Sequence, residues 1–300
     1  MASKFFNTLW VVGAGTMGAQ IALQSAVHGY TVYMIDLDRE ILEGASERQI
    51  EELRARVQRK ELSDDDAAKI MDRLRFSTAM RGLPAPDLVI EAAVEDLEVK
   101  REIFRRLDER CPAPTILATN SSSIKISAIE SATRRPDRVL NLHFYNPVWQ
   151  RPVVELMRGS ATSDETITTV RSFARSIGVT PLVVQKESTG FLFNRVWRAI
   201  KRECLHLVDE GVASFEDVDR AWMIAFGLPM GPFGIMDRIG LDVVRDIEMT
   251  YYRESGNPSD APPKLLLDKI ERGELGVKTG KGFYTYPHPA YEDPAWLKGK

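Results

Sequence analysis

The chain has 300 residues, of which 44% are hydrophobic and 28% charged, and its formal net charge is −3. This composition is typical of a soluble globular protein of two domains and creates no field that attracts nucleic acid or an anionic membrane. No apolar run is long enough to span a membrane, and two cysteines, Cys111 and Cys204, are too few for a zinc cluster or a disulfide framework, so we expect a cytoplasmic protein without a metal.

The first predicted strand, residues 8–12, leads into a glycine-rich turn and then a helix. The turn consists of Gly13, Ala14, Gly15, Thr16, Met17 and Gly18. The first glycine of such a turn permits the bend, the second admits a pyrophosphate, and the third lets the helix pack on the strand. Helix amides then face the anion, so the pattern indicates dinucleotide binding rather than a glycine turn that binds nothing.

The second predicted strand, 31–36, ends in Asp36, 18 residues after Gly18. A carboxylate at this place accepts hydrogen bonds from an adenosine ribose. It would also repel a 2′-phosphate, so Asp36 favours NAD over NADP, although Arg39 is close in the sequence.

Strand patterns alternate with helical patterns as far as residue 187. The strands are predicted at 8–12, 31–36, 75–78, 87–92, 115–119, 138–144, 152–157 and 179–185. This alternation predicts an α/β domain over 1–187, with a mostly parallel, helix-flanked sheet of the Rossmann type. An insertion at about 39–73 reads as two charged helices that project from the sheet, with a break at Leu62-Ser63 and with Ser63 and Asp64 as caps.

Strand patterns stop at about residue 188, and helices are predicted at 191–210, 215–226 and 238–253. We therefore expect an all-α domain over 188–300. Its apolar content is high for its size. A homodimer interface explains this apolar content better than a hydrophobic core within a single subunit does.

Polar side chains follow two of the predicted strands where an open α/β sheet binds ligands. Glu95 and Lys100 could bracket a nicotinamide ribose, although acidic residues also favour a solvated helix start. The run Thr119-Asn-Ser-Ser-Ser123 has more hydrogen-bonding side chains than a helix cap requires, which suggests a polar site.

His143 lies on a predicted strand whose antiparallel return carries Glu155, 12 residues later. Pairing of the two strands would bring the carboxylate within reach of the imidazole. A carboxylate fixes the imidazole tautomer and stabilises its conjugate acid, as a general base facing an alcohol requires. A hydrogen-bonded structural histidine is the alternative. Asn194, at the start of the second domain, could hold a substrate carbonyl or make an interdomain hydrogen bond.

These motifs together resemble the L-3-hydroxyacyl-CoA dehydrogenase family, in particular its 3-hydroxybutyryl-CoA dehydrogenase branch. The resemblance spans nearly the whole chain. The matching segments are Gly13–Gly18, Glu91-Ala-Ala-Val-Glu95 with Lys100, Asn120–Ile124, His143-Phe-Tyr-Asn-Pro147, Val154-Glu155, Gly190–Arg195, Leu228–Phe233, Gly240-Leu-Asp242 and Lys278–Phe283.

The resemblance implies an NAD-dependent enzyme of fatty acid metabolism that interconverts 3-hydroxyacyl-CoA and 3-oxoacyl-CoA. It implies His143 as general base, Glu155 as its orienting partner, and Ser122 and Asn194 as contacts of the substrate oxygens. The implied NAD contacts are the glycine turn, Asp36, Glu95, Lys100, Ser122, Asn146 and Lys278. The predicted hairpin would bind coenzyme A, with Lys60 matching a basic residue of the family by its position along the first helix.

Two departures from the family pattern leave alternatives open. Leu53 stands where the family often has a small polar residue, and Glu187-Ser-Thr precedes Gly190 in place of an Asp-x-Pro sequence. Tyr145, Trp149 and Gln150 add bulk near His143. One alternative is a dehydrogenase of a free hydroxy acid or sugar acid, as in the gulonate dehydrogenase and lambda-crystallin branch. A second is a dehydrogenase that acts on an acyl group bound to a carrier protein. The third is an NAD-binding protein without catalytic activity.

Overall fold

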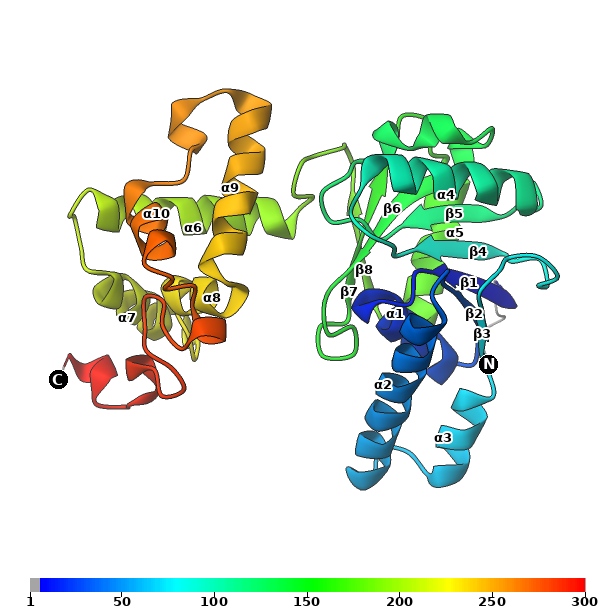
Figure 1. The fold of residues 1–300 in the computed structure, drawn as a ribbon, viewed down its shortest axis with the longest axis horizontal. Helices are drawn as coiled ribbons and strands as arrows, with labels where there is room; N and C mark the ends of the chain where they lie inside the picture. The colour runs from blue at the N-terminus through cyan, green and yellow to red at the C-terminus, as the bar shows by residue number, and fades with distance from the viewer. Residues whose placement is uncertain (1–5, 300) are drawn as a thin grey trace. The chain divides into compact units, whose positions relative to one another are not determined.

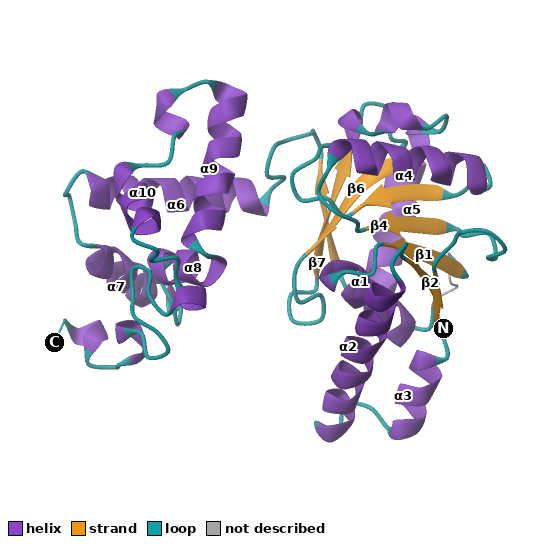
Figure 2. Cartoon of the chain, in the orientation of Figure 1, coloured by secondary structure: helices purple, strands orange, loops and turns teal. Residues whose placement is uncertain are grey.

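In this computed structural model, residues 6–299 are described, and the chain divides after Leu192 into two compact units. Figure 2 shows strands and helices in the first unit and helices joined by loops in the second. Among the described residues, no helix is both long and apolar enough to cross a membrane. The predicted α/β class with a helical second part is confirmed.

The first unit is built on an eight-stranded sheet with the order β3-β2-β1-β4-β5-β6-β7-β8. All neighbouring strands are parallel except β6 and β7. Each predicted strand is found with its ends within one residue. The strands are β1 Thr8–Val12, β2 Thr31–Ile35, β3 Leu74–Ser77, β4 Leu88–Glu91, β5 Ile116–Thr119, β6 Val139–Phe144, β7 Val153–Arg158 and β8 Thr180–Val184.

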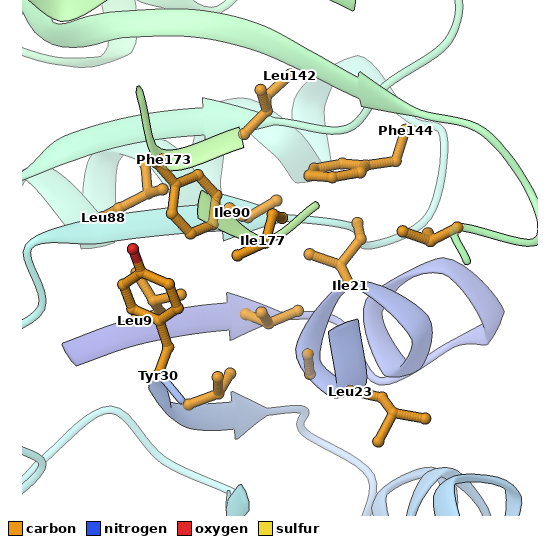
Figure 3. Close-up of a cluster of buried hydrophobic side chains, with 14 of the residues drawn as sticks. Leu9, Ile21, Leu23, Tyr30, Leu88, Ile90, Leu142, Phe144, Phe173 and Ile177 are labelled. Atoms are coloured by element: carbon orange, nitrogen blue, oxygen red, sulfur yellow. The ribbon is translucent and has the colours of Figure 1, made fainter. Parts of the chain in front are cut away.

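Alternating side chains of the strands build two hydrophobic cores, one on each face of the sheet. Leu9 and Val11 face the helices α1 (Thr16–Val27) and α5 (Asp164–Ser176), where Figure 3 shows Leu9, Ile21, Phe144 and Phe173 gathered in one cluster. Trp10 and Val12 pack on the other face, which α4 (Leu97–Arg110) covers. Helices therefore cover both faces, and the loops at the carboxyl ends of β1, β4, β5 and β6 meet at one edge.

Two helices, α2 (Arg39–Gln58) and α3 (Asp64–Met71), form a hairpin that extends away from the sheet (Figure 1). Ser63 caps α3 through a reciprocal capping box with Asp66. The expectation for Asp64 as a second cap is wrong, because Asp64 is already the first helical residue.

The end of α2 corrects the expected place of Lys60, which lies beyond the helix rather than along it. Lys60 has a left-handed backbone with φ of 60°, and the amide of Glu61 bonds to the carbonyl of Arg56 at 2.9 Å. These are the features of a Schellman C-cap, here with lysine in the position that glycine usually takes.

The second unit consists of helices around a core of its own. One prediction is wrong here: Gly240, with φ of 101°, interrupts the expected helix 238–253 and separates α8 from α9. The helices are α6 Phe193–Asp209, α7 Phe215–Phe226, α8 Pro232–Ile239, α9 Leu241–Ser255 and α10 Lys264–Glu271.

Candidate active site

The three glycines of the turn after β1 have different roles. A Cβ on Gly13 would lie 2.6 Å from the backbone of Ala92, and one on Gly18 would lie 1.9 Å from the carbonyl oxygen of Gly13. These two glycines are therefore required by the packing of the protein itself. A Cβ on Gly15, by contrast, would meet nothing within 4 Å among the described residues. The middle glycine thus faces the open space into which a phosphate group can enter.

The carboxylate of Asp36 lies against this turn. Its Oδ2 accepts the amide of Ala14 at 2.8 Å, and its Oδ1 accepts the amide of Asp38 at 3.1 Å. Arg48 of α2 also holds the turn, because its guanidinium donates to the carbonyl of Ala14 at 3.2 Å. No sequence pattern distinguishes Arg48, which is one of many charged residues in that helix. Asp36 remains partly exposed and has lone pairs left for ribose hydroxyls.

Glu91 at the end of β4 is fully buried and joins three elements. Its Oε1 accepts hydrogen bonds from the ammonium of Lys100 and from the amide of Ala93, both at 2.7 Å. Its Oε2 accepts a hydrogen bond from the hydroxyl of Thr119 at 2.6 Å. A buried carboxylate needs this compensation, since loss of one partner would leave an unpaired charge. Glu91 stands in the quoted motif, but no role was predicted for it.

Lys100 is 1% exposed and also lies 3.4 Å from Oε2 of Glu95. The structure thus brings Glu95 and Lys100 together, with the ammonium beneath the carboxylate. Ser121 donates to Glu95 at 2.5 Å and Ser123 at 2.7 Å. Partial burial opposes ionisation, but these hydrogen bonds and the Lys100 charge lower the pKa of Glu95 below its usual value.

Ser122 is exposed, like Ser123, but it differs from its two neighbours because both of them bind Glu95 and it does not. Two asparagines fix its loop. Asn120 accepts the amide of Phe144 at 2.9 Å, and the fully buried Asn141 accepts the amide of Ile126 at 2.9 Å and donates to the carbonyl of Ile124 at 3.0 Å. Ser122 is therefore presented on a rigid turn at the carboxyl edge of the sheet.

His143 and Glu155 are direct partners in the β6–β7 ladder. Nδ1 of His143 lies 2.9 Å from Oε2 of Glu155, and the residues are 9% and 0% exposed. A carboxylate can only accept, so Nδ1 carries the proton and Nε2 keeps its lone pair. Oε1 of Glu155 accepts the amide of Leu192 at 2.9 Å.

Two aromatic rings flank the imidazole. The ring of Phe191 lies 5.1 Å and that of Tyr145 lies 5.3 Å from the His143 ring, measured between centroids. Phe191 has a left-handed backbone with φ of 53°, an unusual conformation for an aromatic residue and one that places strain next to the histidine. The expected bulk of Tyr145 near His143 is confirmed, whereas the packing of Phe191 on the imidazole was not predicted.

The other predicted site residues are Asn146, Asn194, Lys278 and Lys60. Asn146 accepts a hydrogen bond from Gln20 of α1 at 3.0 Å, so it lies beside the helix that follows the glycine turn. Asn194 is the second residue of α6 and is half-buried. Lys278 forms an ion pair with Asp242 at 2.5 Å, which joins two of the quoted motifs within the second unit. Lys60 is exposed at the tip of the hairpin.

A groove of about 420 Å³ lies between α1 and α2. It is lined by Thr16 and Gln20 of α1, by Arg48 and Glu52 of α2, and by Trp149 from the loop after His143. The guanidinium of Arg56 lies 5.0 Å from the centre of the Trp149 ring. Leu53 is buried in the core beneath the hairpin, with 2% exposure.

Comparison with known proteins adds independent information. Residues 8–188 match the family described as the NAD binding domain of 3-hydroxyacyl-CoA dehydrogenase, and residues 190–286 match its C-terminal domain. The probable 3-hydroxybutyryl-CoA dehydrogenase of Bacillus subtilis strain 168 is 36% identical over 278 residues, which cover 93% of this chain and 96% of that protein.

Solved structures give the same picture. A crystal structure of (S)-3-hydroxybutyryl-CoA dehydrogenase from Ralstonia eutropha matches with a TM-score of 0.89 and 35% identity, covering 94% of this chain and 100% of that chain. A diketoreductase structure, whose description refers to dual catalysis of dicarbonyl compounds, matches with a TM-score of 0.81 and 36% identity over 94% of this chain and 99% of that chain.

Proposed function

The chain belongs to the 3-hydroxyacyl-CoA dehydrogenase family, and from that premise we propose that it interconverts an L-3-hydroxyacyl-CoA and the 3-oxoacyl-CoA with NAD, using His143 as general base. The observation that carries the proposal is the buried contact of 2.9 Å between His143 and Glu155. It lies at the carboxyl edge of the sheet, where the glycine turn also opens.

In the oxidation direction, Nε2 of His143 accepts the proton of the 3-hydroxyl group. Glu155 offsets the positive charge that then forms on the imidazole, and proton transfer to a positioned base contributes roughly 10²–10⁴-fold to a rate. Ser122 and Asn194 donate hydrogen bonds to the substrate oxygens and fix the reacting geometry. In the reverse direction, the protonated His143 returns the proton to the 3-oxo oxygen.

NAD, when bound, supplies the hydride acceptor, and the residues of the first unit fit it. The open space at Gly15 admits the pyrophosphate, while Gly13, Ala14, Thr16, Met17 and Gly18 form the surrounding turn. Asp36 accepts hydrogen bonds from the adenosine ribose. Glu95, Ser122 and Asn146 lie at the same edge and take the nicotinamide half, with Lys100 acting from beneath Glu95. Lys278 contributes from the second unit.

Coenzyme A binds along the hairpin of α2 and α3. The groove beside Trp149 supports this, because it leads from α2 to the loop that follows His143. Lys60 at the hairpin tip contacts the nucleotide end. The test compares acetoacetyl-CoA with a truncated acetoacetyl thioester that lacks the nucleotide. Lys60→Ala should lower kcat/KM for the full substrate only, and Lys264→Ala on α10, an exposed lysine outside the hairpin, serves as the control; equal losses for both substrates would contradict the assignment.

The main experiment measures NADH oxidation with acetoacetyl-CoA in the parent enzyme and in His143→Ala. We expect turnover by the parent, and a variant that still binds NADH but loses at least about 100-fold in kcat. Full activity of His143→Ala would disprove the base assignment. Absence of turnover with any 3-oxoacyl thioester would disprove the activity.

A free dicarbonyl or hydroxy acid is the second candidate substrate. The similarity to the diketoreductase favours it, as does Leu53 of α2, which is apolar and buried and so offers no polar contact to coenzyme A. A panel of free 3-oxo acids and diketo acids, assayed beside acetoacetyl-CoA at equal NADH, separates the two. The substrate with the larger kcat/KM identifies the function.

We also propose a homodimer formed through the second unit, and a cytoplasmic location. Large apolar side chains on that unit support the dimer, because Val196, Ile224 and Phe226 are 53%, 61% and 63% exposed. Both cysteines are buried free thiols, in keeping with a reducing compartment. Light scattering at micromolar concentration gives the mass: a monomer would exclude the dimer, and Phe226→Glu should convert a dimer to monomers.

A further inference from the structure

We propose that Gln20 of α1 is a positioning residue, which turns the side-chain amide of Asn146 so that its NH₂ group faces the nicotinamide half of NAD. The inference rests on the proposed function, in which Asn146 is one of the NAD contacts. It deepens that proposal, because it says which end of the Asn146 amide meets the cofactor. Gln20 acts through Asn146 in this assignment.

Strand β6 ends against helix α1. Phe144, the last residue of β6, and Ile21, the neighbour of Gln20 in the helix, belong to the same buried cluster (Figure 3). This packing brings the loop after β6 to the half-buried side chain of Gln20, which lies 126 residues before Asn146 in the chain. Gln20 thus joins the helix that follows the glycine turn to the loop that follows His143.

Two hydrogen bonds connect Gln20 to this loop. Its Oε1 accepts a hydrogen bond from the backbone amide of Val148, and its Nε2 donates to Oδ1 of Asn146, both at 3.0 Å. Val148 is fully buried in a turn where the amide of Gln150 bonds to the carbonyl of Pro147 at 3.1 Å. The Val148 amide is adjacent to that carbonyl in the chain and cannot bond to it. Gln20 therefore supplies the acceptor that this buried amide needs.

The two hydrogen bonds can run in only one direction. A backbone amide can only donate, so the atom of Gln20 that faces Val148 must be the oxygen. The NH₂ group of Gln20 then faces Asn146, and this donor requires the Asn146 oxygen as its acceptor. Turning either side-chain amide over would set two donors against each other. The Val148 amide therefore fixes the orientation of both side chains.

The NH₂ group of Asn146 is consequently turned away from Gln20. Asn146 is exposed, so a ligand can reach this group. An NH₂ group can donate two hydrogen bonds and accepts none. The nicotinamide ring carries a carboxamide, whose oxygen is the matching acceptor. An unrestrained asparagine would present either end of its amide, whereas Gln20 selects the donating end before the cofactor binds.

The test is Gln20→Glu, which keeps the shape of the side chain but can only accept hydrogen bonds at neutral pH. The carboxylate would still accept from Val148. Asn146, however, would have to turn over, donate to the carboxylate and present its oxygen to the cofactor. The measurement is the dissociation constant of NAD and that of 3-acetylpyridine adenine dinucleotide, in which a methyl group replaces the carboxamide NH₂ group.

The two cofactors differ in what they offer to Asn146. Both carry the carbonyl oxygen, so the parent should bind them within about threefold of each other. Only NAD carries a group that can donate to the oxygen of a turned Asn146. Gln20→Glu should therefore weaken binding of the analogue about 3- to 10-fold more than binding of NAD, the effect of one hydrogen bond.

The ratio of the two dissociation constants separates positioning from other effects. A new negative charge on α1 weakens both cofactors alike, because both contain the same pyrophosphate. Gln20→Ala removes both hydrogen bonds and lets Asn146 turn either way, so it should weaken both cofactors equally and leave the ratio unchanged. The matched control is Gln20→Glu in an Asn146→Ala background, where the ratio should not respond to the change at Gln20.

Three outcomes would overturn the proposal. The first is a Gln20→Glu enzyme that binds the two cofactors in the parental ratio. The second is a change of ratio that persists in the Asn146→Ala background, since the effect would then bypass Asn146. The third is parental NAD affinity in Asn146→Ala, which would also remove the proposed cofactor contact. All of these measurements concern binding, so an enzyme that does not turn over acetoacetyl-CoA would refute the proposed activity while the ratio still decides the role of Gln20.

Discussion

Glu155→Gln is the change that tests the site most directly. Glutamine has the same shape but no charge, and its amide offers one accepting oxygen where the carboxylate offers two. His143 and the amide of Leu192 donate to different oxygens of Glu155, so in the variant one of these two donors faces the NH₂ group. An unsatisfied buried donor costs about 1–3 kcal/mol, and the free energy of unfolding should fall by that amount.

The expected loss of activity follows from the hydrogen bond to the imidazolium. A charge-assisted bond at 2.9 Å is worth about 1.5–3 kcal/mol, and each 1.36 kcal/mol is tenfold in rate. We therefore expect kcat to fall by about 10- to 150-fold, with an unchanged dissociation constant for NADH.

The assay is steady-state oxidation of NADH by acetoacetyl-CoA at saturating substrate, with NADH binding measured separately by fluorescence. Glu98→Gln on α4 is the matched control, because that side chain is 77% exposed and pairs with Arg101 on the surface. A folded Glu155→Gln enzyme with kcat within threefold of the parent would refute the role that we assign to the pair.

The remaining predictions concern cofactor and stability. Asp36→Ala should weaken NADH binding more than NADPH binding, and an unchanged ratio of the two dissociation constants would contradict its ribose role. Gly15→Ala should keep the parental melting temperature and lose NADH binding. Gly18→Ala should fail to fold stably, because its Cβ would lie 1.9 Å from a carbonyl oxygen. Calorimetry with and without NADH tests both variants. Hydrogen bonds from Arg198 and Ser255 lower the pKa of Asp260 from 3.8 to about 2, so its stabilising effect is present above pH 4 and is lost as the pH falls through 2. Asp260→Asn should thus cost up to about 2 kcal/mol in urea unfolding at pH 7 and progressively less below pH 4; a constant difference would contradict this.

The fold was predictable because its signals are local. A buried parallel strand needs a short apolar run, and a helix cap needs one side chain at the right position, so the eight strands and the Ser63 cap could be found from the sequence. The break at Gly240 was missed because glycine is tolerated inside a helical pattern. Only the backbone reveals that φ is positive there.

The candidate site was predictable to the level of residues but not of atoms. The register of two paired strands suffices to bring Glu155 to His143. The sequence could not reveal that Ser121 and Ser123 bind Glu95 while Ser122, which lies between them, does not, because three adjacent serines look alike until their partners are placed. The sequence also could not reveal that Lys100 lies next to Glu95 because its ammonium forms an ion pair with the buried Glu91.

The loop that connects the antiparallel strands β6 and β7 limits which insertions and deletions this enzyme can tolerate. In an antiparallel ladder the numbers of facing residues have a fixed sum, as in the pairs His143 with Glu155 and Asn141 with Met157. Adding or removing one residue between Tyr145 and Pro152 would offset the ladder, present Val154 or Leu156 to the imidazole, and send the acid to the opposite side of the sheet. Variant libraries aimed at new acyl groups should therefore exchange side chains such as Trp149 and keep the number of residues in this segment constant.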